Sequence, residues 1–321
     1  MDFSLSQEQE MFREYIKKFL GDMEQTKIAR DYIDNKTEHV KKFLSDLKEL
    51  GWTKLNIPEE FEGMGLGQLD LVPIMEEFGR VLLPGLYLET NALAVPLIER
   101  FGTMEQKQYF LRGIADSNLN LTMAWLEPGG SYKEQGIRLS GEVIQGQIIL
   151  NGVKTQVPDL ELAQHVIVPL RIHNEITLIT VDLSTPGISI TPQNNFAETR
   201  KLSMVEFEQV KVPAENVIGQ IGDGWGMLQE GLLYYNAALS SVAVGAMEHI
   251  VEFANVMDAE ELVEISKVHI CAPVAPLEYG QSDDFDESFR RTYLWTKEPL
   301  KFEGYSHDVY VQTDGGAVDQ Y

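Results

Sequence analysis

The chain has 321 residues, a formal net charge of −24 at pH 7 and a hydrophobic content of 44%. This length allows two or three domains with substantial cores. The acidity opposes binding to nucleic acid or to anionic membranes, and no apolar run is long enough to cross a bilayer. The polar N-terminus does not resemble a signal peptide, and the single cysteine, Cys271, allows no internal disulfide, so we expect a cytoplasmic protein.

The first third of the chain has a helical pattern. Ser6 and Gln9 have the spacing of a capping box, and apolar residues follow at helical intervals. Further helices are expected over residues 39–50, 69–83, 91–101 and 104–114, with a glycine-rich structured loop over 55–67. Gly51 is placed to end one of these helices, and Thr103 to cap another. Residues 1–120 therefore predict a helical domain.

The period changes after this point, and β-branched residues become frequent. Strands are expected over residues 137–144, 147–150, 164–170, 176–181, 187–191 and 204–212. Gln145-Gly146 and Asn151-Gly152 have the composition of turns. Residues 121–222 therefore predict an antiparallel β-barrel or sandwich, which makes the fold class α+β.

A second helical region begins near residue 223, and a helix is expected over residues 227–257. Its many alanine, serine and glycine residues favour close contact with another helix, in a bundle or an oligomer interface. The alternative is an alanine-rich surface helix. We expect residues 223–260 to be the first helix of a C-terminal bundle and assign no fold to residues 261–321.

The stretch with the most chemical content is residues 124–131, Ala-Trp-Leu-Glu-Pro-Gly-Gly-Ser. Pro128 restricts the backbone, while Gly129 and Gly130 can adopt positive φ, so backbone N–H groups can approach a ligand. Such a turn can bind a phosphate or the polar edge of a heterocycle. The alternative is an ordinary Pro-Gly turn.

Five motifs in one order carry a resemblance to a known family. They are NIPEEFEGMGLG at residues 56–67, GTMEQKQY at 102–109, LEPGGS at 126–131, NGVK at 151–154 and FEQVKVPAENVIG at 207–219. Together they resemble the acyl-CoA dehydrogenase family over residues 1–260. The resemblance implies a helical N-terminal domain, a β-barrel middle domain and the start of a C-terminal helical bundle.

The resemblance also implies bound FAD and the α,β-desaturation of an acyl-CoA or acyl-carrier thioester. The expected partners are an electron-transfer flavoprotein or a similar acceptor, and further subunits in a homo- or hetero-oligomer. The residues that match FAD-binding positions are Trp125, Leu126, Gly130, Ser131, Val157 and Pro158. The residues that match substrate-binding positions are Ser131, Tyr235 and Asn236.

Several positions depart from the family pattern. Leu126 replaces a threonine, and Gln156-Val157-Pro158 replaces the Trp-Ile-Thr that packs on the flavin. Tyr235 stands where some members have the catalytic glutamate, and a phenol with an ordinary pKa of about 10 is a poor base. Gln312–Gly316 only faintly resembles the late glycine-rich motif. The catalytic base is therefore unassigned, and a non-catalytic or half-site subunit, or an incomplete member, remains the alternative.

The six histidines are scattered, and none has metal-ligand spacing. Cys271 is the only cysteine of the chain, and we expect its thiol to be inert. We therefore expect no metal site.

Overall fold

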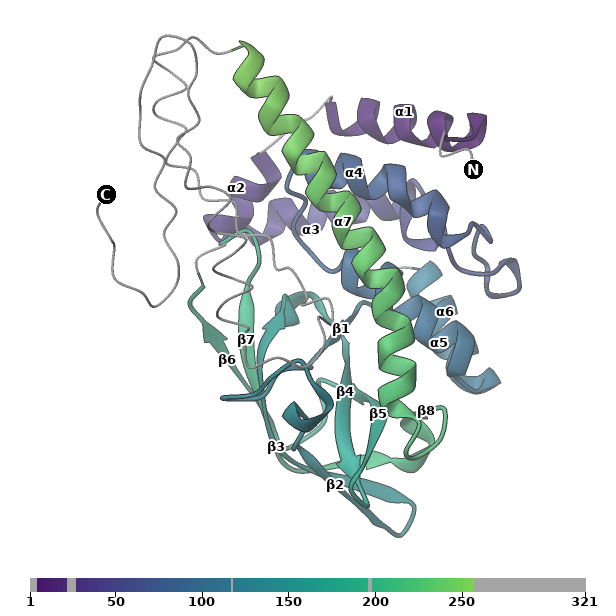
Figure 1. The fold of residues 1–321 in the computed structure, drawn as a ribbon, viewed down its shortest axis with the longest axis vertical. Coiled ribbons are helices and arrows are strands. Elements are labelled where there is room, and N and C mark those ends of the chain that lie inside the picture. Colours follow the sequence, from purple (N-terminus) through teal and green to yellow (C-terminus); the bar gives the residue numbers. More distant parts are fainter. Residues whose placement is uncertain (1–4, 22–26, 117, 196–197, 257–321) are drawn as a thin grey trace, which may run out of the picture. The chain divides into compact units, whose positions relative to one another are not determined.

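The computed structural model describes residues 5–21, 27–116, 118–195 and 198–256 (Figure 1). Residues 1–251 group into one compact unit, and the rest of the chain forms a second one. Only the end of one helix is described for the second unit. The expectations about Cys271, Gln312–Gly316 and residues 261–321 lie outside the described residues.

The helical expectation for the first third is confirmed. The helices are α1 (Gln7–Gly21), α2 (Lys27–Ile33), α3 (Thr37–Glu49), α4 (Val72–Arg80), α5 (Val95–Phe101) and α6 (Met104–Ala115). The N-terminal capping box is present, since the N–H of Gln9 donates to Ser6 Oγ at 3.2 Å and the N–H of Ser6 to Gln9 Oε1 at 2.9 Å. Gly51 has φ 79°, so it ends α3 in the left-handed region.

One feature of this region has no signal in the sequence pattern. Before α5, residues Leu88–Ala94 form a π-helical segment, whose residues are all buried. The helix expected over residues 91–101 therefore begins earlier and contains a widened turn. Widened turns of this kind are rare and often lie at functional sites.

The middle segment forms one eight-stranded mixed sheet. Its strands are β1 (Leu121–Met123), β2 (Ser140–Ile144), β3 (Gln147–Pro158), β4 (His165–Ile172), β5 (Glu175–Asp182), β6 (Ile188–Gln193), β7 (Leu202–Pro213) and β8 (Val217–Ile218). The strand order is β6-β7-β3-β2-β4-β5-β8, and β1 pairs with β4. The pairs β1–β4 and β2–β4 are parallel, and the other described pairs are antiparallel.

One of the two expected turns is confirmed and the other is wrong. Gln145 and Gly146 have φ 50° and 77° and connect β2 to β3 as a tight hairpin. Asn151 and Gly152 instead lie inside β3, where the register with β7 shifts. Asn151 Oδ1 accepts the N–H of Gln209 at 2.9 Å. The Asn-Gly pair therefore continues β3 opposite a β-bulge at Glu208-Gln209 of β7 and does not reverse the chain.

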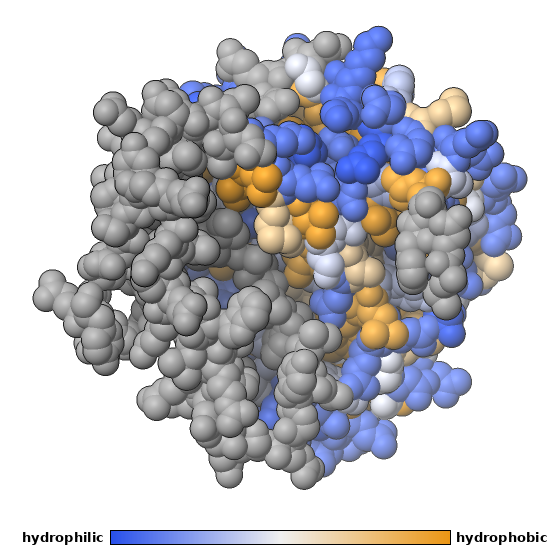
Figure 2. Space-filling model, turned by 45° about the horizontal axis from the view of Figure 1, so that its top comes forward, coloured by the Kyte–Doolittle hydropathy of each residue, from blue (hydrophilic) through white to orange (hydrophobic). Residues whose placement is uncertain are grey.

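Helix α7 (Gly224–Val256) follows the sheet and crosses α4 at very short range. A Cβ atom on Gly245 would lie 1.8 Å from the carbonyl oxygen of Glu76, and one on Gly79 would lie 2.0 Å from that of Val242. This face of α7 is therefore packed, as its small residues predict. Elsewhere on α7 apolar side chains stay exposed, including Leu233 at 70% and Val251 at 58%. Figure 2 shows apolar side chains gathered among hydrophilic ones on one face of the molecule.

Candidate functional site

The turn that follows β1 is held from within. Gly129 has φ 64°, and the N–H of Gly130 donates to the carbonyl oxygen of Glu127 at 2.8 Å. A Cβ atom on Gly130 would lie 2.7 Å from that same oxygen, so the turn requires glycine at this position. Ser131 is exposed, and its Oγ accepts the N–H of Lys133 at 3.2 Å. The N–H of Gly130 is thus used inside the turn and is not a donor for a ligand.

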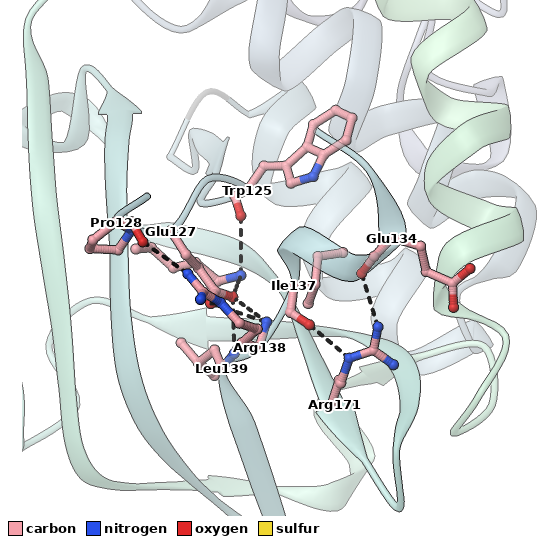
Figure 3. Close-up of polar contacts among 9 residues, drawn as sticks. Trp125, Glu127, Pro128, Glu134, Ile137, Arg138, Leu139 and Arg171 are labelled. Carbon is pink, nitrogen blue, oxygen red and sulfur yellow. Dashed lines mark hydrogen bonds and ion pairs between the residues drawn. The ribbon is translucent and has the colours of Figure 1, made fainter. Parts of the chain in front are cut away.

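A buried ion pair fixes the base of this turn (Figure 3). Lys154, whose side chain is 0% exposed, places Nζ 2.8 Å from Glu127 Oε1 and also donates to the carbonyl oxygen of Trp125 at 3.1 Å. The backbone N–H groups of Arg138 and Leu139 donate to the same carboxylate at 2.9 Å. These two donors are directed to Glu127 instead of a neighbouring strand, so β2 begins at Ser140 and not at residue 137 as expected.

Burial and hydrogen bonding act on the two charges of this pair in different ways. Burial lowers the pKa of Lys154 to about 8, against the raising effect of Glu127. Burial alone would raise the pKa of Glu127, but the hydrogen bonds from Lys154 and the Leu139 N–H bring it below its ordinary value. Both groups are therefore charged near pH 7.

The loop after the turn is also anchored. Arg171 Nε donates to the carbonyl oxygen of Ile137 at 2.7 Å, and its Nη2 donates to that of Glu134 at 2.9 Å (Figure 3). The guanidinium therefore ties residues 134–137 to strand β4. With the Glu127–Lys154 pair, it makes the whole segment a rigid scaffold.

The predicted FAD positions Trp125 and Leu126 offer hydrogen-bond donors. Within the described chain, neither backbone N–H donates a hydrogen bond, while the Leu126 carbonyl accepts the N–H of Thr155 at 2.7 Å. The indole Nε1 of Trp125 is buried and likewise has no partner there. The Trp125 ring meets Tyr132 edge to face at 5.2 Å. These donors fit the acceptor-rich pyrimidine edge of a flavin.

The other two predicted FAD positions fit less well. Val157 is 0% exposed and belongs to the core of the sheet, so its side chain faces away from any ligand. Pro158 has no N–H, and its carbonyl oxygen accepts the Thr122 hydroxyl at 3.0 Å. The preceding residue, Gln156, has φ 54° and donates its N–H to Gln193 Oε1. Strand β3 thus contacts the turn through the hydrogen bond from Thr155 to Leu126, but residues 156–158 include no aromatic side chain that could pack on a flavin.

The predicted substrate residue Tyr235, on α7, belongs to a polar cluster that sequence analysis missed. Its hydroxyl donates to Glu89 Oε1 at 3.2 Å, and Arg200 donates to the same oxygen through two nitrogens at 2.7 and 2.8 Å. Arg200 Nη1 also lies 3.7 Å from Asp159 Oδ2. Asp159 Oδ1 accepts the hydroxyl of Tyr32 at 2.6 Å. We call these five residues, Tyr32, Glu89, Asp159, Arg200 and Tyr235, the buried carboxylate cluster.

Low solvent exposure governs the protonation of the buried carboxylate cluster. Burial raises the pKa of Glu89 and of Asp159 above their ordinary values, and Arg200 opposes both shifts. Burial and the nearby Glu89 raise the pKa of Tyr235, so its phenol keeps its proton at neutral pH. Asn236, the other predicted substrate residue, is half-buried beside it, and its carbonyl accepts the Ser240 hydroxyl.

One sign of this cluster is present in the sequence. Glu89 is a single acidic residue in the otherwise uncharged stretch 86–98. Glutamate is almost never fully buried unless it has a partner. The pattern therefore marks Glu89, but it cannot identify Arg200 or Asp159, which come from distant segments.

The described residues contain no group of three or more His, Cys, Asp or Glu side chains arranged to hold a metal ion. None of their helices is long and apolar enough to cross a membrane.

Comparison with known proteins gives consistent results. A family model described as "Acyl-CoA dehydrogenase, N-terminal domain" matches residues 6–118. An acryloyl-CoA reductase (NADH) of Anaerotignum propionicum is 26% identical over 87% of this chain and 71% of its own length. Acyl-CoA dehydrogenase FadE12 of Mycobacterium tuberculosis is 30% identical over 59% of this chain and 51% of its own length. The chain thus spans about half the length of several curated relatives that it matches.

Solved structures share the fold. An acyl-CoA dehydrogenase from Geobacillus kaustophilus superposes with a TM-score of 0.72 at 23% identity, over 92% of this chain and 77% of its own. One from Bacillus anthracis, complexed with FAD, has the same TM-score and identity over 78% of this chain and 45% of its own. The ChsE4–ChsE5 complex from Mycobacterium tuberculosis gives 0.66 at 24% identity, over 81% and 69%. At these identities the likeness establishes the fold alone.

Proposed function

Since this chain belongs to the acyl-CoA dehydrogenase family, we propose that it binds FAD and moves two hydrogens between the flavin and the Cα–Cβ bond of an acyl thioester. The observation that carries the proposal is the rigid turn at residues 125–131, with its unused donors. The N–H groups of Trp125 and Leu126 would bind the flavin edge, and the exposed Ser131 would lie beside flavin or thioester. One named relative binds FAD, which supports this choice of cofactor.

The chemistry divides between cofactor and protein. FAD, when bound, supplies a two-electron acceptor for the hydride from Cβ. The protein's part is to fix donors before the ligand arrives, because the Glu127–Lys154 pair and Arg171 already hold the turn and its following loop. Tyr235 is protonated at neutral pH and its hydroxyl donates to Glu89, so it does not remove the α-proton.

The proton acceptor and the redox partner are part of the same proposal. Because Tyr235 stands where some members have the catalytic glutamate, we place the acceptor outside the described residues, either later in this chain or on a partner subunit. The electron partner is an electron-transfer flavoprotein or a similar acceptor. One relative is named a reductase that uses NADH, and another is named a dehydrogenase, so their names describe opposite directions of reaction. We therefore propose that the redox partner sets the direction.

A specific observation favours one alternative function, a half-site subunit of a hetero-oligomer. The chain has tyrosine in place of the base and exposes Leu233 and Val251 on α7, while a relative in fold is a complex of two named proteins. In this alternative the protein binds FAD but turns over only with a related partner. Full activity of the homogeneous protein would exclude it.

The first experiment is a visible absorption spectrum of the purified protein with FAD, before and after anaerobic addition of mixed acyl-CoA thioesters. A flavin band that bleaches supports the dehydrogenase function. A flavin band that does not bleach, but does so when a related subunit is added, supports the half-site subunit. A protein that retains no FAD contradicts both functions.

A matched pair of variants tests whether FAD binding depends on the ion pair under the turn. Lys154→Met removes the buried cation under the turn, and we expect it to lose most of the bound FAD. Lys42→Met makes the same change on the exposed side of α3 and should retain the wild-type amount.

A further inference from the structure

Two carboxylate oxygens of the buried carboxylate cluster have no hydrogen-bond donor among the described residues. Glu89 and Asp159 are 3% and 0% exposed, and each carboxylate accepts its side-chain hydrogen bonds on one oxygen, Glu89 Oε1 and Asp159 Oδ1. The second oxygens, Glu89 Oε2 and Asp159 Oδ2, are buried without a hydrogen-bond partner among the described residues. Buried carboxylate oxygens normally have partners, and leaving one empty is costly. Two such atoms in one cluster therefore indicate a ligand or a bound proton.

The charges in the cluster do not balance either. Arg200 is its single cation, and it faces two carboxylates, on Glu89 and Asp159. Lys201 lies nearby, over the Tyr32 ring, but its Nζ is paired at 3.1 Å with Glu161. With both carboxylates ionised, the described cluster carries one uncompensated negative charge.

Two tyrosines connect the cluster to the turn. The Arg200 side chain is 27% exposed, and Tyr235 is half-buried. Tyr132 lies close enough to Tyr235 to contribute to its raised pKa, and its ring contacts Trp125 at the start of the turn. Tyr132 and Tyr235 therefore place the cluster close to the turn.

We propose that the buried carboxylate cluster binds a protonated amine on the acyl group of the substrate, with Glu89 Oε2 and Asp159 Oδ2 as acceptors. This inference rests on the proposed function, because it takes the acyl thioester to lie beside the turn. An ammonium group has three donors and one positive charge, so it supplies both the hydrogen bonds and the charge that the cluster lacks. A carboxylated acyl group would instead meet net negative charge, and Arg200 is already engaged by Glu89.

The test compares acyl-CoA thioesters that differ in one terminal group. The probes are β-alanyl-CoA, 3-hydroxypropanoyl-CoA and propanoyl-CoA, and the 6-aminohexanoyl, 6-hydroxyhexanoyl and hexanoyl thioesters. Dissociation constants are measured by calorimetry on the full chain with FAD. At the chain length that fits, we expect the amine to bind about tenfold or more tightly than the other two, as expected for a hydrogen bond to a charged group.

Three variants test whether the buried carboxylate cluster causes the preference for the amine thioester. Glu89→Gln and Asp159→Asn each remove one negative charge while keeping the shape of the side chain, and each should reduce the preference for the amine to less than about twofold. Glu161→Gln removes a charge from a residue that is 44% exposed and should keep the preference. Far-UV circular dichroism checks the fold, and either cluster variant suffices if the other does not fold.

The outcomes separate this inference from the proposed function. If all three thioesters of a length bind equally while the flavin still bleaches, the amine site is wrong and the dehydrogenase function stands. If the hydroxyl form binds as tightly as the amine, the cluster selects a neutral donor and the ammonium site is contradicted. If no thioester binds, the proposed function fails, and the amine site fails with it.

Discussion

The side chain of Lys154 is 0% exposed, and its positive charge is compensated by a single carboxylate, that of Glu127. Removing one member of a buried ion pair leaves the other charge without compensation, which costs more than removing both. The geometry of the turn therefore depends on a charge balance between a strand residue, Lys154, and a turn residue, Glu127. This balance can be tested by a double-mutant cycle.

We expect Lys154→Met to lower the free energy of unfolding by about 3–5 kcal/mol, because the Glu127 carboxylate stays buried without a cation. The double variant Glu127→Gln/Lys154→Met should recover at least half of this loss. Urea titration followed by tryptophan fluorescence measures both. A double variant as unstable as the single one would show that packing, and not charge, holds the turn.

The same lysine gives a pH dependence with a definite sign. Its pKa is lowered by burial to about 8 in the folded protein and has the ordinary value of 10.5 in the unfolded chain. Between these values the unfolded chain binds more protons, so this group makes the free energy of unfolding rise with pH from about 8 to 10.5. The rise should be absent from Lys154→Met. Equal slopes in both proteins over this window would contradict the assignment.

At the scale of elements, two contacts fix the helices, one between α6 and the sheet and one between α4 and α7. Gln106 on α6 caps its own helix with Thr103 and also donates to the carbonyl oxygens of Glu215 and Val217 at 2.8 Å, which ties α6 to β8. Gly245 and Gly79 let the backbones of α7 and α4 come into contact. The position of α7, and hence of Tyr235, depends on both.

Gly245→Ala tests the α7–α4 crossing. The new methyl group would lie 1.8 Å from the Glu76 carbonyl oxygen, so the helices must separate, and we expect a loss of about 1–3 kcal/mol in the free energy of unfolding. Gly226→Ala is the control on the same helix, because nothing lies within 4 Å of its Cβ. It should be neutral or stabilising by up to about 1 kcal/mol, since alanine favours the helix. Thermal or urea unfolding distinguishes the two, and an equal gain in both would contradict the close crossing.

At the scale of the whole molecule, charge is the dominant property. A net charge of −24 on 321 residues opposes compaction through self-repulsion. Salt screens this repulsion over distances beyond the Debye length of about 8 Å at physiological ionic strength. A buried carboxylate needs a local cation such as Arg200 because burial removes its hydration.

We therefore expect the melting temperature at pH 7 to rise as NaCl increases from about 0.02 to 0.5 M. The measurement is differential scanning fluorimetry, with glycine betaine at equal osmolality as the uncharged control. A melting temperature that falls with NaCl would mean that local ion pairs such as Arg13–Glu77 contribute more than long-range repulsion.

The sequence by itself indicated the succession of a helical, a β and a second helical region, the caps at Ser6 and Thr103 and the hairpin at Gln145-Gly146. These features depend on residues within a few positions of one another, through side-chain period, capping and turn preference. Only the tertiary structure decided that Asn151-Gly152 lies inside a strand opposite a bulge, that β1 and β2 pair in parallel with β4, and that Glu89, Asp159 and Arg200 share one site. Buried polar groups take their partners from distant segments, so a local pattern can mark a buried charge but cannot identify what balances it.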